Sequence, residues 1–151
     1  MRAASQALIN LSPHDTDAAF SLAFAYAQLD RVQDAAAAFD QVKPATALDQ
    51  QLLDAGRFTY QSLLKPALRP QAMAALDTLR RAKLSPSSQG DLMQLYLALD
   101  DTEPVLQMLS GNCANDPIDC IDLAINPLWQ PLHGNPRFEK LAKQYTTLTL
   151  E

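Results

Sequence analysis

The stretch that decides the fold is residues 17–42, DAAFSLAFAYAQLDRVQDAAAAFDQV. Its apolar residues recur three and four positions apart, which is the period of an α-helix with one buried face. The tripeptide Leu29-Asp30-Arg31 interrupts this pattern and leaves room for only a tight connection, so we predict two antiparallel helices. The predicted buried stripe consists of Ala19, Leu22, Ala23, Tyr26, Ala35, Phe39 and Val42.

The composition of the chain favours an all-α fold. The chain has 151 residues, enough for one domain with a real core, and only 4 of them are glycine. One helical hairpin buries too little apolar surface to be stable alone, so we expect further helices to pack on it. Ala23 and Ala35 are small residues placed where neighbouring helices would approach closely.

Charge and hydropathy exclude two classes of partner. The formal net charge of −5 is spread along the chain, whereas binding to nucleic acid requires clustered Lys and Arg. We interpret the densest basic cluster, Arg80, Arg81 and Lys83, as a solvated helix end. No apolar run approaches the roughly 20 residues of a membrane span, so we expect no membrane insertion. Residues 1–11 lack the basic and apolar regions of a signal peptide, which favours the cytoplasm slightly and leaves the periplasm open.

The stripe of residues 17–42 resembles the tetratricopeptide repeat, a helix-turn-helix unit, in register. The family pattern has a large residue, Leu, a small residue, Tyr, Ala, an aromatic residue and a small or apolar residue. Ala19 departs from it, because the family often has Trp there. The register puts the closing Pro at Ala47, and Pro44 comes earlier. The resemblance implies an all-α, right-handed solenoid of stacked hairpins, and the alternative is an ordinary hairpin within a non-repeat bundle.

The remaining chain continues as predicted hairpins within one domain. Prolines and glycines place helices at about 46–64, 71–84 and 86–99, a helix ending at Gly111-Asn112, and final helices at 117–124 and 136–147. Because the chain begins partway into a repeat, we expect it to be a fragment of a longer protein. The predicted divisions are a preceding repeat's tail (1–12), repeat 1 (15–43), a degenerate repeat 2 (46–84), repeat 3 (86–111) and a C-terminal cap (116–147).

Residues 126–141, NPLWQPLHGNPRFEKL, resemble the closing segment of many bacterial tetratricopeptide proteins. Such segments occur in winged-helix transcription regulators, receptor-like Ser/Thr kinases and nucleotide cyclases, which implies a signalling or regulatory parent protein. The last repeat of a solenoid must cover the apolar face of its neighbour, so we expect an apolar cap. The matching positions are Pro127, Trp129, Leu132, Asn135, Pro136, Arg137, Phe138 and Leu141.

The sequence offers little for catalysis, and we predict a non-enzyme without cofactor or metal. His14 and His133 lie in predicted turns with no acidic or nucleophilic cluster near them in sequence. The spacing of Cys113 and Cys120 is neither a redox nor a zinc motif. Two interpretations remain for these cysteines. They form a disulfide if the chain is exported, or Cys120 is buried and Cys113 is an exposed thiol if it is cytoplasmic.

The resemblance implies a concave groove, lined by the first helices of the repeats, that holds a peptide or protein partner. The alternative for Phe20 and Phe24 is packing against the first helix of the next repeat. We therefore expect a non-catalytic binding scaffold of a larger bacterial regulatory protein, or else a small-ligand sensor or homodimerisation module. The candidate groove residues are Phe20, Ser21, Phe24, Gln28, Arg57, Phe58 and Gln61.

Overall fold

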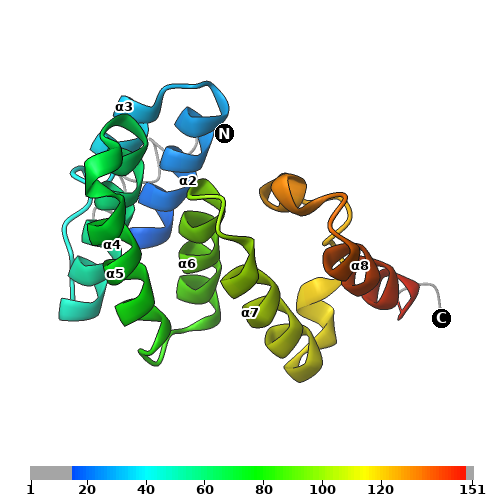
Figure 1. Ribbon diagram of the computed structural model, residues 1–151. Coiled ribbons are helices and arrows are strands. Elements are labelled where there is room, and N and C mark those ends of the chain that lie inside the picture. Colours follow the sequence, from blue (N-terminus) through cyan, green and yellow to red (C-terminus); the bar gives the residue numbers. More distant parts are fainter. Residues whose placement is uncertain (1–14, 149–151) are drawn as a thin grey trace. The chain divides into compact units, whose positions relative to one another are not determined.

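The computed structural model describes residues 15–148, and within them the protein consists of helices and turns without a strand (Figure 1). The prediction of an all-α fold is confirmed. None of the helices in this range is long and apolar enough to cross a membrane. The elements are α2 (Thr16–Gln28), α3 (Val32–Ala38), α4 (Ala47–Leu64), η1 (Pro66–Leu68), α5 (Arg69–Arg80), α6 (Pro86–Ala98), α7 (Thr102–Asn115), η2 (Pro117–Cys120), η3 (Pro127–Leu132) and α8 (Pro136–Leu148).

The chain forms two compact units, Met1–Leu99 and Asp100–Glu151, which are described separately. The predicted tail of a preceding repeat, residues 1–12, lies outside the described residues. Of the predicted third hairpin, α6 belongs to the first unit and α7 to the second, so its pairing stays a prediction.

The first hairpin of the first unit is the predicted one. The carboxylate of Asp15 caps α2 by accepting a hydrogen bond from the backbone N–H of Ala18. After α2 the backbone of Asp30 adopts a positive φ of 58°. The N–H of Arg31 then donates back to the carbonyl of Tyr26 at 2.9 Å. This pattern of bonds closes the helix end and reverses the chain, which explains the tight turn at Leu29-Asp30-Arg31.

An aromatic cluster forms the centre of the first unit. The ring of Phe39 meets Phe20 edge-on at 5.0 Å between centroids and stacks on Tyr60 at 5.9 Å. Gly56 of α4 provides the space for this ring, because a Cβ there would overlap Phe39. The side chains of Ala23 and Ala35 are fully buried, as their small size predicts for helices in close contact.

Helix α6 is enclosed by α2, α4 and α5, and the residues from Leu92 to Leu97 are all buried. The buried amide of Gln94 donates to the carbonyl of Phe20 at 3.1 Å and to the hydroxyl of Tyr60 at 3.3 Å. Helices α2, α4 and α6 therefore contact one another around a filled centre. In a solenoid each repeat contacts only its neighbours, so the contact between α2 and α6 departs from that arrangement.

The second unit combines two α-helices, α7 and α8, with two short 3₁₀ helices, η2 and η3, and a covalent link. Cys113 of α7 and Cys120 of η2 form a disulfide, with their Cα atoms 5.6 Å apart, which is the first of the two interpretations of these cysteines. The side chain of Asn135 caps α8 by accepting from the N–H of Arg137 at 3.0 Å. The predicted apolar cap residues Trp129, Leu132 and Phe138 are buried.

Two predicted helix boundaries in the second unit are wrong. Helix α7 does not end at Gly111-Asn112 but continues to Asn115, since one glycine inside a helix costs only about 1 kcal/mol. The predicted helix 117–124 is instead a short 3₁₀ helix, Pro117–Cys120, followed by turns. Its apolar residues Ile118 and Ile121 are exposed, so this segment has too little buried surface to stabilise a longer helix.

Candidate functional site

The structure separates the predicted groove residues of α2 by burial. Ser21 and Gln28 are exposed and Phe24 is half-buried. The side chain of Phe20 is only 1% exposed, and its ring packs against Phe39, the C-cap residue of α3. The ring of Phe20 is therefore part of the core and offers no surface to a ligand.

Of the predicted groove residues of α4, Arg57 and Gln61 lie toward α3. The guanidinium of Arg57 bonds the carboxylate of Asp54 at 2.8 Å and that of Asp40 at 3.2 Å, and it lies over the ring of Phe58. Gln61 lies about one helical turn further along α4 and lines an open cleft. The ion pair between Arg57 and Asp40 connects α4 to the end of α3, next to this cleft.

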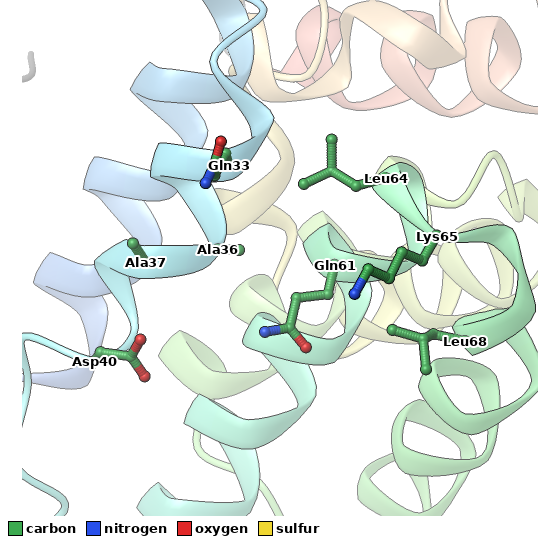
Figure 2. Close-up of a pocket in the computed structure, with 8 residues that line it drawn as sticks. All are labelled: Gln33, Ala36, Ala37, Asp40, Gln61, Leu64, Lys65 and Leu68. Atoms are coloured by element: carbon green, nitrogen blue, oxygen red, sulfur yellow. The ribbon is translucent and has the colours of Figure 1, made fainter.

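This cleft, which we call the α3–α4 cleft, lies between α3, the end of α4 and η1 (Figure 2). Its volume of about 380 Å³ lies toward the lower end of the range for binding pockets. The side chains of Gln61 and Lys65 extend across the opening toward α3. The lining residues are Gln33, Ala36, Ala37, Asp40, Gln61, Leu64, Lys65 and Leu68.

The α3–α4 cleft combines an apolar wall with separated polar groups. Ala36 and Ala37 form its α3 side, and their short side chains leave the space open. Leu64, which is 53% exposed, supplies accessible aliphatic surface. The carboxylate of Asp40 and the ammonium of Lys65 provide opposite charges, and the amides of Gln33 and Gln61 can each donate and accept hydrogen bonds.

Sequence reasoning identified Gln61 and missed the other cleft residues. The run of alanines at residues 35–38 could have indicated the cleft. The buried stripe of a helix uses only some of four consecutive residues, so at least one of these small side chains had to lie on an accessible face. Ala35 and Ala38 are fully buried, whereas Ala37 is exposed. A second signal was the apolar pair Leu63 and Leu64, since both side chains are exposed at the end of α4.

The other sequence candidates for chemistry do not gather into a site. His133 is exposed and its ring lies 5.4 Å from that of Phe138, while His14 is outside the described residues. Within residues 15–148, His, Cys, Asp and Glu form no group that could hold a metal ion. Comparison of the chain with protein-family models, curated proteins and solved structures finds no significant match.

Proposed function

We propose that this chain is a non-catalytic scaffold domain of a larger bacterial regulatory protein, and that it binds a peptide segment of a protein partner in the α3–α4 cleft. The observation that carries the proposal is the cleft itself, an open space with exposed aliphatic surface, two amides that have no hydrogen-bond partner among residues 15–148, and two opposite charges. Peptide-binding sites commonly combine such anchors for side chains with hydrogen-bonding groups for the backbone.

A recurrence in the chain supports tetratricopeptide-like hairpins as the basis of the scaffold. Helices α2 and α6 each span 13 residues, and each is followed by Leu-Asp, with the Asp at φ 58° and 57°. Four residues of the first helix and its turn are identical to the residues 70 positions later in the chain. This spacing is close to twice the repeat length of about 34 residues in the tetratricopeptide family. The identical pairs are Leu22 and Leu92, Tyr26 and Tyr96, Leu29 and Leu99, and Asp30 and Asp100.

The chemistry of the cleft specifies the kind of segment that fits. An aliphatic side chain of the bound segment would contact Leu64 and Leu68 and occupy the open space beside Ala37. The amides of Gln33 and Gln61 would pair with the N–H and C=O groups of an extended backbone. Asp40 and Lys65 favour a segment that carries a basic residue on one side of the aliphatic residue and an acidic residue on the other.

The proposal is tested by selecting peptides from a random library displayed on phage against the full chain, then measuring their affinities by calorimetry. Ala37→Arg fills the cleft from an exposed position, so we expect selected peptides to bind it at least about tenfold more weakly. Ala74→Arg is the matched control, because Ala74 is exposed on α5, outside the cleft. If the selected peptides bind both variants as they bind the native chain, the α3–α4 cleft is not their site.

A further inference from the structure

Two carboxyl groups meet where the start of α2 contacts α6. Asp17 lies in the first turn of α2, and Asp91 lies in α6, one helical turn after Ser87. The hydroxyl of Ser87 donates to Oδ2 of Asp17 at 2.6 Å. The carboxyl of Asp91 lies within hydrogen-bond reach of the carboxyl of Asp17. Oδ2 of Asp91 is buried and receives no hydrogen bond from a donor of the described chain.

This arrangement is satisfied only when a proton lies between the two carboxyl groups. Two carboxylates in contact repel each other, and a buried carboxylate without a donor is strongly unfavourable. A protonated Asp91 instead donates to Asp17. The charge then stays on Asp17, which is the more exposed of the two, accepts from Ser87 and lies at the positive end of the α2 dipole.

Electrostatics gives the same assignment. Burial is the main cause that raises the pKa of Asp91 to about 10, and the hydrogen bond and charge of Asp17 and the charge of Asp15 add to it. The hydrogen bond from Asp91 lowers the pKa of Asp17. In α5, Arg69 donates to the carbonyl of Leu99 and Asp77 accepts from the hydroxyl of Tyr96, so neither side chain is paired with the two carboxyl groups. In α4, Arg57 pairs with Asp54 of the same helix and with Asp40.

We propose that Asp17 and Asp91 form a proton-sharing clasp that holds the start of α2 against α6 and loosens when the shared proton is lost. The clasp makes the filled centre of α2, α4 and α6 responsive to pH. It is independent of the α3–α4 cleft, because neither carboxyl lines that cleft.

The sign of the pH dependence follows from the number of bound protons. In the unfolded chain both aspartates lose their protons near pH 4, whereas the folded chain keeps one up to about pH 10. The folded state therefore binds more protons between these values, and its stability falls as the pH rises through this window. The contribution of this proton to the free energy of unfolding is therefore full below the unfolded pKa, and it is lost as the pH rises to the folded pKa.

The experiment compares the full chain with its Asp91→Asn variant in denaturant unfolding across a pH series. The amide of the variant donates to Asp17 at every pH, so it keeps the contact without a titrating proton. We expect the ratio of the native unfolding constant to that of Asp91→Asn to rise about tenfold per pH unit between about pH 6 and about pH 9. Asp101→Asn is the control, because Asp101 is an N-cap without a side-chain cap bond, and this variant should leave the pH dependence unchanged.

A second measurement does not depend on the variant folding. Carbon NMR of the carboxyl groups in the folded native chain should show Asp91 titrating near pH 10 and Asp17 titrating below the ordinary Asp value. Asp17→Asn removes the neighbouring charge and should lower the midpoint of Asp91. An Asp91 midpoint near pH 4 in the native chain, or a ratio of unfolding constants that does not change with pH, would overturn the proposal.

Discussion

The two units of this chain solve the same problem, covering short amphipathic helices, by different means. The first unit uses an aromatic cluster around Phe39 and a buried amide, Gln94, that joins α6 to α2 and α4. The second unit has short 3₁₀ segments, a disulfide at the end of α7 and exposed isoleucines at Ile118 and Ile125. A small core relies on a covalent link to restrict its unfolded state, whereas a larger core is stabilised by packing.

The largest expected effect is loss of the disulfide, which should destabilise the second unit alone. Replacing both Cys113 and Cys120 with Ala should lower its free energy of unfolding by about 2–4 kcal/mol, because the unfolded chain gains freedom. Trp129 is the single tryptophan and is buried in this unit, so its fluorescence follows the second unit. If the unfolding transition of the whole chain, followed by circular dichroism, shifts by the same amount as the transition followed by Trp129 fluorescence, the two units unfold together and the comparison fails. A reductant should leave the double variant unchanged.

The next largest effects are expected from the same substitution at one glycine in each unit. Gly56→Ala places a methyl group against the ring of Phe39, which Phe20 and Tyr60 confine, and should destabilise the first unit by about 1–3 kcal/mol. Gly111→Ala has nothing within 4 Å of the new methyl group and should stabilise α7 by up to about 1 kcal/mol. Denaturant unfolding of the two variants measures both values. Equal effects of the same sign would show that helix propensity, not packing around Phe39, decides the result.

The smallest expected effect concerns the feature that recurs in both units. Asp30 and Asp100 have nearly the same positive φ, 58° and 57°, which glycine adopts with less strain. Asp30→Gly and Asp100→Gly should each change stability by less than about 1 kcal/mol, because relief of strain is offset by the greater freedom of glycine in the unfolded chain. Thermal unfolding should show similar shifts of the melting temperature for the two variants. A large loss in only one would show that its carboxylate has a further structural role.

Local features of the fold followed from the sequence, and contacts between distant segments did not. Apolar spacing and turn chemistry predicted the helices of the first hairpin, the turn at Asp30 and the burial of Trp129 and Phe138. The end of α7 was missed because Gly111 was interpreted as a helix stop, while the buried Cys113 beyond it continues the packed face.

The candidate site was harder to predict because it depends on how α3 and α4 meet. Helical periodicity places Gln61 on a face of α4, but only the paired helices show that Ala37 leaves space opposite it. The contact between Asp17 and Asp91 could not be predicted for the same reason, since these residues lie on helices far apart in the chain. Hydrophobic patterning identifies which side of a helix is buried, not which neighbour covers it.

The buried amide of Gln94 has a consequence for how the first unit avoids misassembly. Its amide nitrogen meets one carbonyl and one hydroxyl, supplied by two different helices. Sliding α6 by one turn along its axis would move the buried amide away from this carbonyl and this hydroxyl, with the desolvation penalty of an unmatched polar group. A fully aliphatic α6 would tolerate several registers of similar energy, so Gln94 selects one docked arrangement mainly by penalising its competitors.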